Sequence, residues 1–326
     1  MRKVSKSAAA VKTVSKKTSN GVQKLSFWQK VKKDFSKNKG LYVMILPVLA
    51  FYIIFQYGPM FGLSIAFMDY TPGKGFFESP WVGLKHFDAF FHDFYFGRVL
   101  KNTIVIAVVG LIFSFPSQIL LALMINELKN KTFSRIVQSI TYMPHFISIV
   151  VICSMIIMLT SRDGAITAFL SLFGFEKQTM LNRPDLFLPI YIISNIWQNV
   201  GWGSIIFLSA LTGIDPGLYE AAKIDGAGRF RQLISVTLPG ILPTIIIMFI
   251  LEVGKMFNVG HEKILLLYNP ITYETADVIS TYVYRKGLLE ANWSFSTAVG
   301  MFNSVVSFCL VYFTNRFSRR SGTSLW

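Results

Sequence analysis

The segment YEAAKIDGAGRFRQLISVTLPG, residues 219–240, carries charges, three glycines and a proline between two of the most apolar stretches of the chain. The stretch before it covers residues 187–211, and the stretch after it covers residues 241–260. An apolar block of roughly 18 or more residues is typical of a helix that crosses a bilayer. The sequence therefore predicts that the polar segment is a loop between two membrane spans.

Composition and the pattern of apolar blocks together predict a membrane protein. Of the 326 residues, 52% are hydrophobic and 15% are charged, whereas a soluble protein carries about a quarter charged residues. The expected spans are residues 41–59, 103–126, 137–160, 187–211, 241–260 and 294–315. The alternation of a barrel strand is absent, and lipid admits only helices or closed barrels. We expect an all-α polytopic membrane protein with about six transmembrane helices.

The basic residues indicate an orientation. The net charge is +15, and twelve of the 32 Lys and Arg residues precede residue 40, next to the first expected span. Basic residues also follow spans two, four and six: Lys129, Lys131, Arg135, Lys223, Arg229, Arg231, Arg316, Arg319 and Arg320. Six spans place all these groups on one side, which the positive-inside rule makes the cytoplasm. We therefore expect both termini in the cytoplasm and no nucleic-acid partner.

The sequence lacks the motifs of ATP hydrolysis and of metal catalysis. It contains no G-x-x-x-x-G-K-[ST] phosphate loop and no H-E-x-x-H pair. Its four histidines have no metal-ligand spacing: His86, His92, His145 and His261. We therefore expect that the chain is not an enzyme and that it binds no metal or cofactor itself.

Local sequence signals in the loop between spans four and five predict where its helices begin and end. Asp215 precedes Pro216, which is the usual order of an N-cap and a first helical residue. Either Gly226 or Gly228 can adopt the left-handed conformation that ends a helix. A second short helix is expected from near Arg229, and Pro239 is expected to break the chain before span five. Two short helices with a glycine elbow form either a simple connector or a docking surface.

The same loop carries a spaced motif: E-A-A, three residues, G, nine residues, a β-branched residue, one residue, L-P. Its positions are Glu220, Ala221, Ala222, Gly226, Val236, Leu238 and Pro239, and a wider form adds Asp225, Ala227, Phe230 and Pro243. Val236 stands where Ile is commoner. The motif resembles that of the membrane permease subunits of bacterial binding-protein-dependent (type I) ABC importers. The chain is similar to their carbohydrate-uptake branch, in particular to LplB-like permeases, and more distantly to the maltose permease subunits.

The resemblance implies a role for the loop. In such importers the E-A-A helix is a coupling helix that sits in a cleft of an ATPase subunit and moves when the ATPase dimer closes. The residues expected to couple to the ATPase are Glu220, Ala221, Ala222, Asp225, Gly226, Ala227, Phe230, Leu238 and Pro239. The loop would then be polar because it is a docking site.

The resemblance also implies organisation, partners and location. A basic cytoplasmic tail would cover residues 1–40, a six-span permease domain residues 41–315 with its coupling loop at 212–240, and a cytoplasmic tail residues 316–326. The partners would be a second homologous permease subunit, two ATPase subunits that use ATP and Mg, an extracytoplasmic solute-binding (lipo)protein, membrane lipid and an oligosaccharide. The location would be the bacterial cytoplasmic (plasma) membrane.

Span four contains a polar face that could line a path for cargo. Asn195, Gln198, Asn199 and Trp202 stand at i, i+3, i+4 and i+7, so they share one side of a helix. Amides facing lipid are costly, whereas amides and an indole suit the hydroxyls and apolar face of a sugar. The alternative is that these side chains form hydrogen bonds between packed helices. By the resemblance to the maltose system, Asn195 falls at a position on a sugar-lining helix.

Span five adds charged candidates for the same path. Glu252 and Lys255 are three residues apart and can pair, and Asn258 follows one turn later. A charged pair within a span marks a pathway, or else both groups sit near the outer interface and snorkel. Lys255 could also meet an acidic sugar. Packing explains the remaining polar candidates at least as well: Gln56, His145 and Asn303.

Two other classes of function stay open from the residues alone. A self-sufficient secondary transporter would need ion-coupling residues and usually internal repeats, and only the Glu252–Lys255 pair favours it. An ABC importer for a solute other than a sugar would share the same loop motif. The identity of the sugar, its length and its charge do not follow from the sequence.

Overall fold

The computed structural model describes residues 34–319, 322, 324 and 325, so most of the expected basic tail lies outside the described residues. Within the described part, the chain is helical and contains one isolated bridge, between Met68 and Trp81. The all-α fold predicted from the apolar blocks is confirmed. The chain divides into two compact units, one that ends at Gly62 and one that begins at Leu63.

Most of the described part of the first unit is one helical run, which begins after Asn38. It consists of α3 (Lys39–Tyr52), a π-turn (Ile53–Tyr57) and α4 (Gly58–Met60). This run covers the first expected span, residues 41–59, and none of its apolar window is buried inside the chain. Its length and composition suit a helix that crosses a bilayer.

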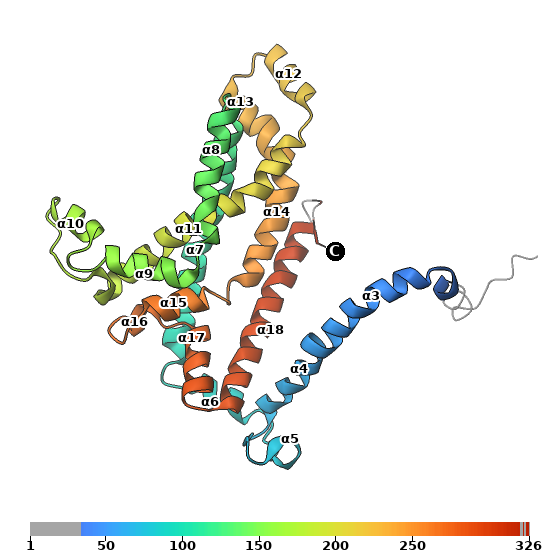
Figure 1. Cartoon of the computed structure of the whole chain (residues 1–326), viewed down its shortest axis with the longest axis vertical. Coiled ribbons are helices and arrows are strands. Elements are labelled where there is room, and N and C mark those ends of the chain that lie inside the picture. Colours follow the sequence, from blue (N-terminus) through green and yellow to red (C-terminus); the bar gives the residue numbers. More distant parts are fainter. Residues whose placement is uncertain (1–33, 320–321, 323, 326) are drawn as a thin grey trace, which may run out of the picture. The chain divides into compact units, whose positions relative to one another are not determined.

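The second unit contains the remaining helices, shown in Figure 1. In chain order they are α5 (Gly75–Glu78), α6 (Lys85–Phe91), α7 (Phe96–Asn126), α8 (Lys131–Tyr142), α9 (Ile149–Leu159), α10 (Ala165–Ser171), α11 (Pro184–Thr212), α12 (Pro216–Ile224), α13 (Arg229–Gln232), α14 (Leu238–Lys255), α15 (His261–Leu267), α16 (Tyr273–Ala276), α17 (Ile279–Tyr284) and α18 (Trp293–Ser318). Helix α7 packs along α11, and α14 packs along α18. These four long helices form the frame on which the shorter outer helices rest.

Length and composition identify four described helices that can cross a membrane: Lys39–Phe67, Phe96–Asn126, Arg229–Lys255 and Trp293–Ser318. A fifth is added if the bent pair α8–α9 counts as one span. This criterion therefore gives fewer spans than the six expected. The missing segment is α11, which has 29 residues but carries polar side chains in its middle.

The third expected span, residues 137–160, is not one straight helix. The run Lys131–Phe146 and helix α9 differ in direction by 98°. Pro144 lies in the 3-10 turn that ends the first run, Met143–Phe146, and Ile147 and Ser148 follow it in a non-helical conformation. A proline lacks the N–H that would continue the α-helical hydrogen bonds, and it therefore promotes this bend. If this segment forms the third expected span, it does so as a bent pair of helices.

The expected break at Pro239 is also wrong. A single helical run extends from Arg229 to Lys255, with a π-turn at Leu233–Thr237 just before α14. The N–H of Leu238 donates to the carbonyl of Leu233, so the ladder shifts by one residue before the proline. A π-turn of this kind accommodates a residue that cannot donate, because the bonding pattern has already changed.

Three buried clusters hold the second unit together. One of them joins α7, α9, α11 and α15 through Ile106, Ile152, Tyr191 and Ile264. These helices are far apart in sequence, and burying their apolar side chains stabilises the unit by roughly 1.5–3 kcal/mol for each large side chain. The same cluster brings polar side chains of α11 and α15 next to each other.

Candidate functional site

The loop around α12 has the geometry that its sequence predicts. The Asp215 carboxylate accepts a hydrogen bond from the N–H of Gly217 at 2.9 Å, as an N-cap does. Gly226 has φ +75°, the left-handed conformation expected at the elbow. The hydroxyl groups of Tyr219 and Thr237 lie 3.0 Å apart and tie α12 to the run that leads into α14. The loop is thus a folded projection with a fixed shape.

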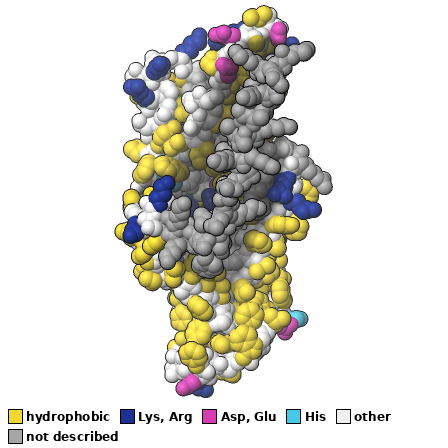
Figure 2. Space-filling view, turned by 90° about the vertical axis from the view of Figure 1, so that its right-hand side faces the viewer, with side chains coloured by type: hydrophobic (Ala, Val, Ile, Leu, Met, Phe, Trp, Pro, Cys, Tyr) yellow, Lys and Arg dark blue, Asp and Glu magenta, His cyan; other side chains and the backbone are white. Residues whose placement is uncertain are grey.

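The motif residues of this loop are largely accessible. Exposed are Glu220, Ala221, Asp225, Gly226, Phe230 and Pro239, whereas Ala222, Ala227 and Leu238 are half-buried. Ile224 is 87% exposed and Phe230 is 73% exposed, which is unusual for apolar side chains outside the bilayer. Figure 2 shows acidic and basic side chains together at the end of the molecule where Figure 1 places α12. This projection offers both charged and apolar groups to a partner.

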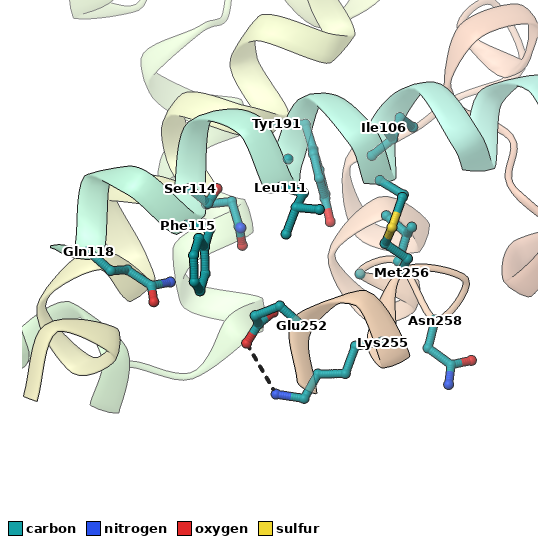
Figure 3. Close-up of a pocket in the computed structure, with 15 residues that line it drawn as sticks. Ile106, Leu111, Ser114, Phe115, Gln118, Tyr191, Glu252, Lys255, Met256 and Asn258 are labelled. Carbon is teal, nitrogen blue, oxygen red and sulfur yellow. Dashed lines mark hydrogen bonds and ion pairs between the residues drawn. The ribbon is translucent and has the colours of Figure 1, made fainter. Parts of the chain in front are cut away.

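A polar hollow lies between α7, α11 and α14 (Figure 3). This hollow, the α14 hollow, has a volume of about 210 Å³. Its polar lining residues are Ser114, Gln118, Tyr191, Asn195, Glu252, Lys255 and Asn258. The Lys255 ammonium lies 3.3 Å from the Glu252 carboxylate, so the predicted pair is confirmed. Asn195 of span four and the three candidates of span five therefore line one cavity, as expected.

A second hollow adjoins the first and is formed by α11, α15 and Ile149. This hollow, the α15 hollow, has a volume of about 460 Å³, within the range of roughly 300–1,000 Å³ common for small-molecule sites. Its polar lining residues are Tyr191, Asn195, Gln198, Asn199, His261, Glu262 and Lys263. The two hollows share Tyr191, Asn195 and Gly260, so they are neighbouring parts of one polar region.

The amides of α11 both line this region and connect helices. Asn199 donates to the Asn195 side-chain oxygen at 3.0 Å, and its own oxygen lies 3.1 Å from His145 Nδ1. Gln198 Oε1 accepts from Lys263 Nζ at 3.2 Å. The polar face can therefore line a path for cargo and also bond neighbouring helices. All three amides line the α15 hollow, and two of them, Gln198 and Asn199, form hydrogen bonds with residues outside α11.

Trp202 lies apart from both hollows. Its ring stacks on His145 with centroids 4.6 Å apart and planes within 4° of each other. The pair sits beside the bend between α8 and α9, where His145 belongs to the 3-10 turn. Trp202 does not line either hollow, although His145 contacts both its ring and the Asn199 side chain. The indole is instead a packing partner at the bend.

Comparison with known proteins bears directly on these features. A family model described as "Binding-protein-dependent transport system inner membrane component" matches residues 118–322. The chain belongs to this family. That membership confirms the resemblance found through the E-A-A loop and makes the chain a multi-pass membrane permease.

Individual relatives are similar over almost the whole chain. The polygalacturonan/rhamnogalacturonan transport system permease protein YteP of Bacillus subtilis (strain 168) is 44% identical over 287 residues, 88% of this chain and 89% of YteP. Protein LplB of the same organism is 40% identical over 285 residues, 87% of this chain and 90% of LplB. These similarities cover both the hollows and the α12 loop.

A solved structure is similar in fold. The chain resembles a component of a bacterial ABC transporter involved in the import of the acidic polysaccharide alginate, with a TM-score of 0.83 and 44% identity. The match covers 89% of this chain and 99% of that one. A second crystal structure, of a bacterial alginate ABC transporter in complex with an alginate pentasaccharide-bound periplasmic protein, has a TM-score of 0.82. The helical arrangement described here is therefore that of an importer permease.

Sequence reasoning missed six polar residues that line the two hollows: Ser114, Gln118, Tyr191, His261, Glu262 and Lys263. Gln118 lies in α7, and a side chain added at Gly203 of α11 would overlap it, so the two helices approach closely there. An amide inside an apolar block is the same signal that identified Asn195, and it would have identified Gln118 too. Lys263 gave no such signal, because a lysine in an expected outer loop is ordinary.

Lys263 is buried in the folded permease. Its side chain is 4% exposed, and burial lowers its pKa from 10.5 to about 8. The ammonium lies 5.8 Å from the centroid of the Tyr191 ring, in addition to its bond with Gln198. At neutral pH the group remains mostly protonated, so the α15 hollow contains a positive charge.

A buried ion-pair network fixes the outer segment that follows α15. The Asp277 carboxylate is fully buried and lies 2.6 Å from the Arg285 guanidinium and 3.5 Å from that of Arg98 on α7. Asn102 donates to the Asp277 carbonyl at 3.0 Å, and Thr103 accepts from the N–H of Ile279 at 2.9 Å. These bonds to α7 hold α16 and α17 in place, and α17 in turn packs against α15.

Proposed function

We propose that this chain is the transmembrane subunit of an ABC importer that takes up an oligosaccharide, driven by ATP hydrolysis in separate subunits. The observation that carries the proposal is the polar region formed by the α14 and α15 hollows inside a permease fold. Its amides can donate to and accept from hydroxyl groups, which are what a sugar offers. Relatives named for transport of polygalacturonan and rhamnogalacturonan support the choice of cargo.

The α12 loop is the proposed contact with the ATPase. Glu220 supplies a polar anchor, Ala221 and Ala222 allow close approach, and Gly226 sets the angle of the elbow. The loop is continuous with α14 through the helical run that begins at Arg229, and α14 lines one of the hollows. Movement of the loop would therefore be transmitted to Glu252 and Lys255 without a flexible joint between them.

The partners follow from the same proposal. A second related permease would complete the path, two ATPase subunits would bind and hydrolyse ATP with Mg, and an extracytoplasmic binding protein would deliver the oligosaccharide. The chain itself would hold no cofactor and perform no catalysis. Its location would be the bacterial plasma membrane with both termini in the cytoplasm, since the basic loops favour that side.

The proposed path runs along α11. Asn195, Gln198 and Asn199 would bond sugar hydroxyls in the α15 hollow, and the Glu252–Lys255 pair with Asn258 would contact cargo in the α14 hollow. Trp202 would act on the path indirectly, through its stack on His145 at the α8–α9 bend. Membership of a binding-protein-dependent family argues against the self-sufficient secondary transporter.

The proposal is tested by uptake into proteoliposomes that contain the complete importer. We expect ATP-dependent accumulation of at least one oligosaccharide from a set of neutral and uronate-containing oligomers, and none with an ATPase subunit that cannot hydrolyse ATP. Accumulation of a solute of another class, with no oligosaccharide transported, would contradict the proposed cargo and leave the importer assignment in place.

A further inference from the structure

Lys263 differs from the other residues that line the two hollows, because it carries a buried charge. It is the third residue of α15, its side chain is 4% exposed, and it lines the α15 hollow. Lys255, by comparison, has a side chain that is 69% exposed and lies 3.3 Å from a carboxylate. Of these two lysines, only Lys263 holds its charge away from water.

The surroundings of Lys263 contain no carboxylate that pairs with it in the described part of the chain. On its own helix it is flanked by His261 and by the exposed Glu262, which both line the same hollow. Cys153 of α9 and Tyr191 of α11 are the titratable groups near it on the neighbouring helices. A buried charge that lacks a counter-ion is costly to maintain.

The hydrogen bonds of Lys263 are also incomplete. An ammonium has three donors, and the Gln198 side-chain oxygen, at 3.2 Å, accepts one of them. The Tyr191 ring adds a weaker attraction at 5.8 Å. Two donors thus remain for a ligand in the hollow, next to the amides of Asn195 and Asn199.

We propose that Lys263 binds the carboxylate of a uronate residue when an oligosaccharide occupies the α15 hollow, so that acidic cargo is preferred to neutral cargo of the same backbone. An ammonium donates strong, charge-assisted hydrogen bonds to carboxylate oxygens. Asn195 and Asn199 bond the adjacent hydroxyls, and the Tyr191 ring can cover an apolar sugar face. This assignment rests on the proposed function, because it presumes that oligosaccharides pass through this hollow.

The test uses the complete importer and a matched pair of cargoes, trigalacturonate and the neutral trimer obtained by reducing its carboxyl groups. Lys263→Met removes the charge and keeps an apolar chain that tolerates burial, whereas Lys263→Arg keeps the charge. Lys177→Met is the matched control, since Lys177 is exposed and lines neither hollow. The readouts are the initial uptake rate at limiting cargo and the ATPase activity stimulated by the loaded binding protein.

We expect Lys263→Met to lower trigalacturonate uptake by about thirtyfold, the lower end of the effect of deleting one partner of a buried charge pair. Uptake of the neutral trimer and the stimulated ATPase activity should fall much less than trigalacturonate uptake, because a neutral sugar offers no carboxylate to the ammonium. Lys263→Arg should recover most of the lost trigalacturonate uptake, and Lys177→Met should change nothing.

Other outcomes would contradict either the anion site at Lys263 or the proposed function. Equal losses for both cargoes, or a loss of stimulated ATPase activity in both Lys263 variants, would show a structural role and overturn the inference. Unchanged trigalacturonate uptake by Lys263→Met would overturn it as well. A wild-type importer that accumulates the neutral trimer alone would refute the anion site and leave the proposed function standing. Transport of neither cargo, nor of any other oligosaccharide, would refute the proposed function first.

Discussion

The α12 loop and the α15 hollow are built in opposite ways by the same chain. Everything that shapes the loop lies within about two dozen consecutive residues: an N-cap at Asp215, an elbow at Gly226 and the helical run from Arg229. The hollow takes its walls from residues as far apart as Ile149 and Lys263. The loop is a local structure with an exposed surface, and the hollow is a product of tertiary packing with a buried charge.

This difference determines how a substitution should act in each region. A change in the loop should leave the helical frame intact and affect only what docks there. A change in the packing around the hollow should affect folding and transport together, because the hollow has no local structure of its own.

The largest effect is expected at Gly201 of α11. A side chain added there would collide with the backbone carbonyl of Thr141 on α8, and backbone atoms cannot move aside cheaply. Gly201→Leu should therefore prevent a stable second unit from forming, and purified protein should be lost. The measurement is the yield of monodisperse protein after extraction in detergent.

Gly300 of α18 provides the control for this prediction. A side chain added at Gly300 meets no atom within 4 Å, although the residue is also helical. Gly300→Leu should give a yield close to that of wild type. Equal yields for the two variants would show that the close α8–α11 contact does not support the fold.

The second effect is expected at the elbow of the loop. Gly226 has φ +75°, where a β-branched residue is strained, and nothing lies within 4 Å of an added side chain. Gly226→Val should therefore act on the backbone alone, re-aim α12 and lower ATP-dependent uptake by about tenfold or more. Because the frame is untouched, the variant should still insert and extract normally.

Gly228 lies two residues away and is the matched control. Its φ is −67°, which any residue adopts, and it also has open space around it. Gly228→Val should retain uptake within about threefold of wild type. Loss of uptake in both variants to the same degree would indicate that bulk, rather than the left-handed elbow, determines docking.

The third effect concerns access along α11. Cysteines at 195 and 199 should react with an aqueous thiol reagent, and bound cargo should slow the reaction several-fold, because both positions line the α15 hollow. A cysteine at 196 should react poorly, since Ile196 packs against a buried cluster. A cysteine at 202 should react without protection by cargo. If cargo slowed the reaction of the cysteine at 202 and not that of the cysteine at 195, the path would lie beside the α8–α9 bend rather than in the α15 hollow.

The smallest effect is a pH dependence of stability. Burial lowers the pKa of Lys263 to about 8, so between that pH and 10.5 the unfolded chain binds more protons than the folded one at this site. Stability should therefore rise with pH through this window relative to Lys263→Met, which lacks the group. The measurement is the difference in Tm between wild type and variant at about pH 8 and about pH 10, close to the two ends of the window. A constant difference would show that Lys263 is not buried as a charge.

The same contrast explains how far the sequence alone could be interpreted. The cap at Asp215 and the elbow of the loop were predictable, since caps, elbows and the E-A-A spacing are local signals. The apolar blocks predicted an all-helical membrane protein, and the Glu252–Lys255 pair was predictable from its helical spacing. The bend at Pro144 and the continuous run through Pro239 were missed, because a proline either breaks a helix or is absorbed by a neighbouring turn, and its tertiary setting decides which.

The hollow lay largely beyond sequence reasoning for a physical reason. Periodicity on α11 identified three of its amides, but it could not separate them from Trp202, which the α8–α9 bend draws into a stack with His145. The burial of Lys263 depends on contacts with Gln198 and Tyr191, some seventy residues earlier. The sequence alone does not distinguish a buried lysine from a solvated one, because only the packing of the folded chain separates them.

The most direct test of the account is a structure of the complete importer trapped with an oligosaccharide between its two permease subunits. The account predicts cargo density in the α15 hollow, with sugar hydroxyls within hydrogen-bond distance of Asn195 and Asn199 and, for an acidic oligomer, a carboxylate at Lys263. Cargo density that contacts α9 or α18 and leaves the α15 hollow empty would contradict it.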